Sequence, residues 1–232
     1  MLEQLASDYR NMFDDLVQKS GEYDGFLSLA KSSWLILDDA ECFYAAMIQD
    51  CYKHRYNKMS ELYDYMYGSA VIIWLMMNKI MNCNTTLCNY HGWELADAMQ
   101  LTNFLRDVKE DYIQLDRIYL PSEELAKFWL THEDIINLCK DKKDWAVWKL
   151  FREFMKHMIA MCRKHYRNAE QWYQYLPAYT RSAISLSWAL YEGILDKIEH
   201  NNYDVFTKSA KTTLFDKLQI IRKWKKNKKQ YQ

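Results

Sequence analysis

Scarcity of backbone breakers is the feature that most constrains how this chain folds. Only five glycines and two prolines occur among its 232 residues. An all-β sandwich needs a turn about every 8–12 residues, and glycine and proline supply many of those turns. Long helices with short connections need far fewer. The composition therefore predicts an all-α protein and excludes collagen-like and loop-rich, disulfide-bonded folds.

Hydrophobic periodicity supports helices along the whole chain. Apolar side chains follow the i, i+3, i+4, i+7 spacing of an amphipathic helix in residues 1–20. The same pattern predicts helices over 26–37, 60–80, 92–114, 144–174, 177–200 and 211–232, and shorter ones starting at Ser122 and after Thr131. Asp38 or Asp39 is the expected cap of a further helix, and Thr131 with Asp134 has capping-box spacing. Because no linker or repeat separates these segments, we expect one domain over residues 1–232.

Charge and hydropathy limit the classes of partner. The 31 basic and 31 acidic side chains cancel, so no overall field attracts nucleic acid. The longest apolar run, Ala70–Met77, is far shorter than the roughly 20 residues that cross a bilayer. No secretory signal follows Met1, and the six cysteines, which have no CxxC spacing, are expected to be reduced thiols. These features predict a cytoplasmic protein.

The stretch Asp97–Pro121 carries the most specific chemical signal. It reads DAMQLTNFLRDVKEDYIQLDRIYLP. Asp107 and Asp111 are four residues apart and lie on one face of a helix, with Asn103 one turn before them and Gln100 on the same stripe. Oxygen ligands at this spacing suit Mg²⁺, with Mn²⁺ as an alternative. A polar stripe in an otherwise apolar helix strengthens this interpretation, because buried polar groups need partners.

Three stretches of the chain resemble one known family. The run Ala98–Asp107, with Glu110, Asp111 and Arg117–Pro121, closely resembles the second aspartate-rich motif of squalene/phytoene synthases. Residues 50–70 and 190–217 agree with that family in order and distance. The resemblance covers nearly the whole chain. It implies an all-α isoprenoid-synthase fold, a single-domain helical bundle around a central apolar cavity.

The family resemblance also implies an activity and a set of site residues. Members join two prenyl diphosphates head to head with Mg²⁺, and the chain is most similar to bacterial and archaeal phytoene synthases. The implied reaction is therefore the conversion of geranylgeranyl diphosphate to phytoene in carotenoid biosynthesis. The matching positions are Tyr65, Gln100, Asp107, Asp111 and Tyr203 as catalytic residues; Asn103, Asp107 and Asp111 as metal ligands; Arg106, Arg117, Lys208 and Lys211 as diphosphate ligands; and Ser69, Ile73 and Trp74 in the pocket for the prenyl tail.

The N-terminus departs from the family pattern. The family has another aspartate-rich motif there, and this sequence starts just after the matching point. Neither Asp14-Asp15 nor Asp38-Asp39 has the spacing to replace it. The resemblance thus implies a bundle truncated at its N-terminus, with half of the metal-binding aspartates missing and little condensation by this chain alone.

Two other functions and the oligomeric state stay open at this point. One alternative is a non-catalytic, truncated family member that binds a prenyl lipid or a partner protein. The other is a synthase of the squalene or dehydrosqualene type, which shares the same motifs but forms another product. The sequence does not determine whether the protein is a monomer.

Residues 218–232 form a basic C-terminal tail, in which Trp224 is surrounded by lysines and Arg222. Each basic residue near an anionic lipid surface contributes about 1 kcal/mol to attachment. Peripheral membrane contact with Trp224 at the lipid interface is therefore one expectation. A solvated, frayed helix end is the other.

Overall fold

The computed structural model describes residues 37–142, 144–208 and 210–227 of the protein. The helices expected within residues 1–36 lie outside this part. Across the described ranges the chain is helical, apart from connections and one isolated bridge between Arg55 and Ile118. The bridge joins the connection before Met59 to the extended segment that contains Ile118. The prediction of an all-α chain is confirmed.

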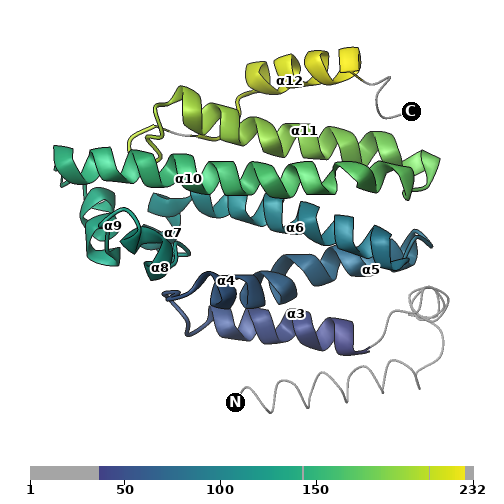
Figure 1. Ribbon diagram of the computed structural model, residues 1–232, viewed down its shortest axis with the longest axis horizontal. Coiled ribbons are helices and arrows are strands. Elements are labelled where there is room, and N and C mark those ends of the chain that lie inside the picture. The colour runs from purple at the N-terminus through teal and green to yellow at the C-terminus, as the bar shows by residue number, and fades with distance from the viewer. Residues whose placement is uncertain (1–36, 143, 209, 228–232) are drawn as a thin grey trace.

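Three long helices form the body of the molecule. Figure 1 shows α6, α10 and α11 side by side, with α3 and α4 on one side and α12 on the other. The elements are α3 Leu37–Asp50, α4 Met59–Met66, the π-helix η1 Tyr67–Val71, α5 Ile72–Ile80, α6 Thr86–Arg106, α7 Val108–Leu115, α8 Ser122–Ala126, α9 His132–Cys139, α10 Trp145–Ala169, the 3₁₀-helix η2 Glu170–Gln174, α11 Ala178–His200 and α12 Leu214–Asn227.

The core lies mainly between α6 and α10, which make the most extensive helix–helix contact. Each helix contributes buried apolar side chains to the shared core, among them Leu101 and Leu105 from α6 and Phe151, Phe154 and Met158 from α10. Burying one such side chain stabilises the fold by about 1.5–3 kcal/mol. This packing fixes α6, the helix that carries the aspartate motif.

The helix predicted over residues 92–114 is wrong in its limits. It starts earlier, at Thr86, because the side chain of Thr85 caps it by accepting a hydrogen bond from the Cys88 N–H at 3.2 Å. It ends at Arg106, since Asp107 leaves the helical region with φ −102° and ψ 15°. A second helix, α7, then begins at Val108.

The helix predicted over residues 60–80 is also divided. The π-helix η1 separates α4 from α5 and contains Gly68. A Cβ at Gly68 would lie 2.6 Å from the Cys42 carbonyl oxygen and 2.7 Å from the Ala46 Cβ, so glycine allows α3 to pack closely here. Hydrophobic periodicity does not register such a local change in winding.

Capping predictions have mixed outcomes. The capping box of α9 is confirmed, because the Thr131 hydroxyl accepts from the Asp134 N–H and the Asp134 carboxylate accepts from the Thr131 N–H. Asp38 and Asp39 do not cap a helix, because α3 already begins at Leu37 and both lie in its first turn. Asp39 is buried and forms an ion pair with Lys79 instead.

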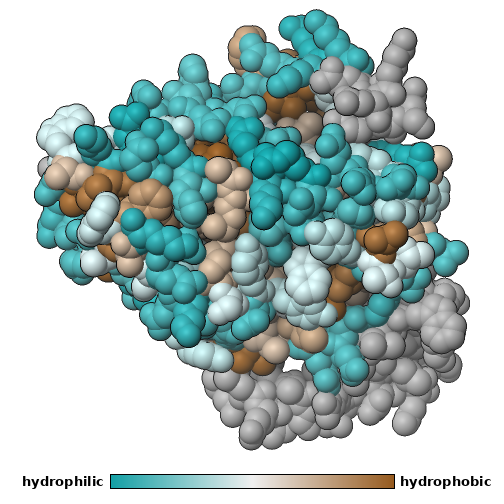
Figure 2. Space-filling view, in the orientation of Figure 1, coloured by the Kyte–Doolittle hydropathy of each residue, from teal (hydrophilic) through white to brown (hydrophobic). Residues whose placement is uncertain are grey.

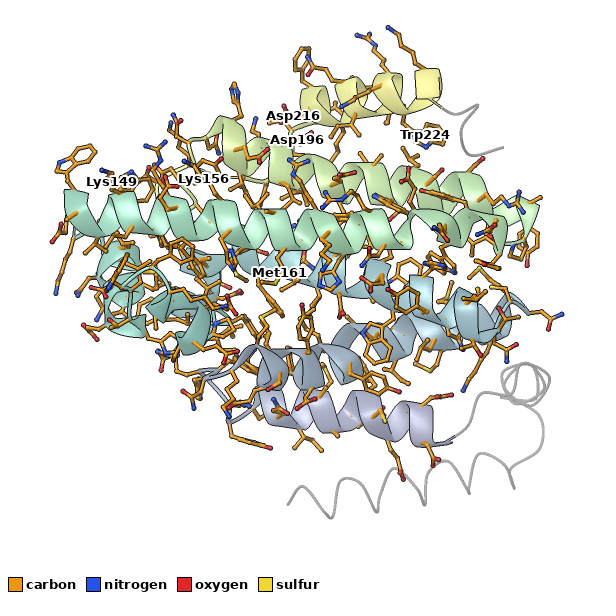
Figure 3. The ribbon with its side chains drawn as sticks, viewed as in Figure 1. Lys149, Lys156, Met161, Asp196, Asp216 and Trp224 are labelled. Carbon is orange, nitrogen blue, oxygen red and sulfur yellow. The ribbon has the colours of Figure 1, made fainter. Side chains whose placement is uncertain are left out.

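The tail helix α12 packs against α11 through one face. The Trp224 indole N–H donates to the Ser185 hydroxyl at 3.0 Å, and Asp216 pairs with Lys197 at 3.0 Å (Figure 3). The Ile220 side chain packs directly over Gly193, where a Cβ would require the end of the isoleucine to shift. Trp224 therefore lies between the two helices, not on the outer face where contact with lipid was expected.

Within the part of the chain that the structure describes, no helix combines the length and the apolar character needed to cross a bilayer.

Candidate functional site

The junction of α6 and α7 positions the predicted metal ligands. The Asp107 N–H donates to the Asn103 carbonyl at 2.9 Å, and the Asp111 N–H donates to the Asp107 carbonyl at 2.8 Å. Helical hydrogen bonds thus continue on both sides of the break at Asp107. The three residues remain at successive turns, as their spacing predicts.

Asp107 is paired with its neighbour Arg106. The Arg106 Nε donates to Asp107 Oδ1 at 2.7 Å, and Nη2 donates to Oδ2. Both side chains are about one-fifth exposed. The hydrogen bond to Asp107 raises the pKa of Arg106, so the guanidinium stays charged. The pair therefore presents a carboxylate and a cation together at the same edge of the bundle.

Asn103 and Asp111 have the properties of unused oxygen ligands. The Asn103 Oδ1 atom is buried and has no hydrogen-bond partner. Burial, followed by the charges of Asp107 and Glu110, raises the pKa of Asp111 to about 7. A divalent cation would satisfy the amide oxygen and offset the repulsion between the carboxylates.

The donor set fits Mg²⁺ only in part. No three His, Cys, Asp or Glu side chains of the described residues are arranged to hold a metal ion. Two carboxylates and one amide supply three oxygen atoms at most in a monodentate arrangement. Mg²⁺ commonly keeps several waters and takes further ligands from substrate phosphates. The site thus fits a metal that is bound together with a phosphate-containing ligand.

A cleft of about 340 Å³ connects Arg106 and Asp107 with the chain segment that follows α11. Lys208 and Lys211 line its opposite wall. Lys211 pairs with Glu110 at 2.8 Å, and this hydrogen bond raises the pKa of Lys211. The structure therefore brings together three of the four side chains that the resemblance implies for diphosphate binding.

The fourth side chain, Arg117, belongs to a different group. Its Nη1 donates to Asp50 Oδ2 at 3.0 Å, and the Tyr119 hydroxyl donates to Asp50 Oδ1 at 3.1 Å. The Tyr65 ring stacks on Tyr119, with the ring centroids 5.6 Å apart, and it packs near Phe104. Burial first, and the nearby Tyr119 and Asp50, raise the pKa of the Tyr65 phenol, so it stays protonated.

Asp50 is the site residue that sequence reasoning missed. It ends α3 and gathers Arg117, Tyr119 and Tyr65 around one carboxylate. The stretch that carries the family resemblance begins at Asp50, and that was the available signal. Its partners lie 15 to 69 positions away along the chain, so spacing alone did not connect them.

The other predicted residues lie on separate elements. Gln100 is half-buried on α6. Tyr203 lies in the turn after α11 and has a positive φ of 64°. The Lys156 Nζ atom lies 5.8 Å from the centroid of the Tyr203 ring. In the predicted tail pocket, the buried Ser69 Oγ has no hydrogen-bond partner, while Ile73 is exposed. The Trp74 ring packs edge-on against Trp172, with the centroids 5.2 Å apart.

Comparison with known proteins identifies the family of the chain. Residues 1–216 match the family described as squalene/phytoene synthase. A chloroplastic phytoene synthase of an Oncidium hybrid cultivar is 38% identical over 181 residues, which are 75% of this chain and 42% of the relative. The 15-cis-phytoene synthase of Synechococcus elongatus is 35% identical over 182 residues, which are 73% of this chain and 56% of the relative. The chain spans about half the length of these relatives.

The arrangement of the helices is shared with a solved structure. A squalene synthase from Alicyclobacillus acidocaldarius superimposes with a TM-score of 0.67 at 21% identity, covering 75% of this chain and 63% of that one. The fold is thus the helical fold of isoprenoid synthases, as predicted. With the match over residues 1–216, the chain belongs to the squalene/phytoene synthase family.

Proposed function

We propose that this protein condenses two prenyl diphosphates head to head, with geranylgeranyl diphosphate as substrate and phytoene as product. The observation that carries this proposal is the cleft in which Arg106 and Asp107 face Lys208 and Lys211. Clustered cations bind diphosphate oxygens, and neighbouring carboxylates bind the metal ion that accompanies a diphosphate. The names of the relatives from Oncidium and Synechococcus support the choice of substrate and product.

The cleft residues divide the work of binding. The planar guanidinium of Arg106 forms paired hydrogen bonds with oxyanions, and the two lysines act as mobile point charges. Asn103, Asp107 and Asp111 would hold Mg²⁺ or Mn²⁺. When bound, the metal stabilises the negative charge of the leaving diphosphate. The hydrogen bond from Arg106 keeps the Asp107 carboxylate oriented at the cleft, which supports this assignment.

Incubation with geranylgeranyl diphosphate and Mg²⁺ tests the proposal directly. The expected product is phytoene, detected by chromatography, and EDTA is expected to abolish it. The assay compares this chain, for which the family resemblance implies little condensation, with a version extended upstream in frame. Absence of turnover in both would contradict the proposal and favour a protein that binds prenyl lipid. Conversion of farnesyl diphosphate alone would instead identify a squalene or dehydrosqualene type of enzyme.

We also propose peripheral attachment of the protein to anionic membranes, at the cytoplasmic side, through the outer face of α12. Leu214, Phe215 and Leu218 are 76%, 66% and 46% exposed. Exposed Arg222, Lys225 and Lys226 follow them, and hydrophilic side chains project over this helix in Figure 2. The acidic residue of α12, Asp216, is turned inward to Lys197. The outer face is thus apolar and cationic, a combination that binds anionic lipid interfaces.

Charge reversal on this face is expected to weaken vesicle binding. The triple change Arg222→Glu, Lys225→Glu and Lys226→Glu should reduce co-sedimentation with vesicles rich in phosphatidylserine at least about tenfold, because each basic residue contributes about 1 kcal/mol. The matched control changes Lys149, Lys164 and Arg167 of α10 to Glu, which alters the net charge equally. Equal losses in the two triple variants would show that net charge, not α12, drives binding.

A further inference from the structure

A polar cluster lies between α4, α6 and α10, about 15 Å along α6 from Asp107. His165 of α10 connects two of its members. Its Nε2 atom lies 2.9 Å from the Tyr63 hydroxyl of α4, and its Nδ1 atom lies 2.7 Å from Glu94 Oε2 of α6. The Met161 side chain points from α10 toward α4, where its sulfur lies 3.8 Å from the same Tyr63 hydroxyl (Figure 3). Three helices are therefore joined at one imidazole.

Asp97 is the fourth member of this cluster, one turn beyond Glu94. It is 4% exposed, and its Oδ1 atom is buried without a hydrogen-bond partner. Its neighbours come from three helices: Trp93 and Glu94 of α6, His165 and Cys162 of α10, and Tyr63 of α4. A carboxylate in such surroundings is costly when ionised, because burial removes its hydration.

The pKa values of two carboxyl groups of the cluster are shifted in opposite directions. Burial raises the pKa of Asp97 to about 7, against a weaker opposing effect of His165. Burial also acts to raise the pKa of Glu94, but hydrogen bonds from His165 and Tyr90 outweigh it and lower that pKa. Glu94 is thus ionised and bound to His165 at neutral pH. Asp97, whose pKa is about 7, is protonated below neutral pH and ionised above it.

We propose that Glu94, His165 and Tyr63 form a hydrogen-bonded brace that fixes α4 against α10, and that this brace tightens when the neighbouring Asp97 is protonated. A proton on the buried Asp97 removes its repulsion with the partly buried Glu94 carboxylate. Glu94 then orients His165, and His165 holds the Tyr63 hydroxyl. Because Tyr65 is two residues further along α4, the brace also bears on the candidate site. The inference goes beyond the proposed condensation, and its test does not depend on catalysis.

The sign of the pH effect follows from proton binding. Between the ordinary Asp value of 3.8 and about 7, the folded protein holds a proton on Asp97 that the unfolded chain has released. The contribution of Asp97 to stability therefore falls as pH rises through this interval, and the loss is complete above it.

Thermal unfolding of the full chain tests this pH effect. Asp97→Asn is expected to raise the unfolding midpoint relative to wild type by about 5 °C more at pH 8.0 than at pH 5.5, because wild type loses part of the Asp97 contribution between these two pH values. The matched control is Asp64→Asn, which removes an exposed carboxylate from α4 itself. Its effect should be the same at both pH values. An Asp97→Asn effect that does not change with pH would overturn the proposal.

Hydrogen exchange of the α4 amides tests the link to α4. After correction for intrinsic rates, wild-type protection of these amides is expected to fall at least about tenfold between pH 6 and pH 8, relative to the α9 amides of the same sample. Asp97→Asn should show no such fall, and His165→Gln should lose protection at both pH values. Constant α4 protection in wild type would overturn the brace even if Asp97→Asn does not fold.

Discussion

Asp107→Asn is expected to lower phytoene formation at least about 100-fold and to raise the Mg²⁺ concentration needed for activity. The change keeps the shape of the side chain and one oxygen acceptor for Arg106, but it removes the negative charge that a divalent cation requires. Asp107 lines the cleft together with Lys208 and Lys211. Turnover as a function of Mg²⁺ concentration is the measurement.

The loss of activity should occur without a comparable loss of stability. The Arg106–Asp107 pair joins adjacent residues, so it closes no long loop and contributes at most about 1 kcal/mol. The matched control is Asp196→Asn on α11, whose carboxylate is 59% exposed and lies outside the cleft lining. Wild-type turnover by Asp107→Asn would show that this cleft does not hold the metal-bound diphosphate.

Asp50→Ala has the largest effect that we expect on stability, a loss of about 3–5 kcal/mol in the free energy of unfolding. The substitution leaves the Arg117 guanidinium without its carboxylate partner. This is costly because the Arg117 side chain is only 14% exposed, so water cannot fully replace the lost partner. It also removes the acceptor of the Tyr119 hydroxyl. Urea unfolding should show a lower midpoint with an unchanged slope.

A double-mutant cycle separates the ion pair from simple loss of packing. Arg117→Met removes the charge and keeps an apolar stem, so Asp50→Ala in that background should cost less than in wild type. The control is Asp116→Ala, which breaks the Arg55–Asp116 pair at the surface, where Asp116 is 67% exposed, and should cost about 1 kcal/mol or less. Additive effects of Asp50→Ala and Arg117→Met would contradict the proposed coupling.

The helical class and the placement of Asn103, Asp107 and Asp111 at successive turns could both be predicted because their signals are local. Five glycines and two prolines, with regular apolar spacing, already require long helices. Asn103, Asp107 and Asp111 share one face because helical geometry repeats every few residues, and the backbone bonds among them follow that register. The family could be identified for the same reason, since its motif is contiguous.

Contacts between distant segments were decided by the tertiary structure alone. Arg117 was expected at the diphosphate, yet it holds Asp50 from α3, and Trp224 was expected at lipid, yet it packs on α11. Asp97 carried no signal as one acid in a helical motif. Packing of α4 and α10 around it makes it a buried carboxyl group with one oxygen, Oδ1, that has no hydrogen-bond partner. Periodicity says which face of a helix is apolar. Which helix covers that face, and which polar groups become enclosed there, depends on how the helices pack around the shared core.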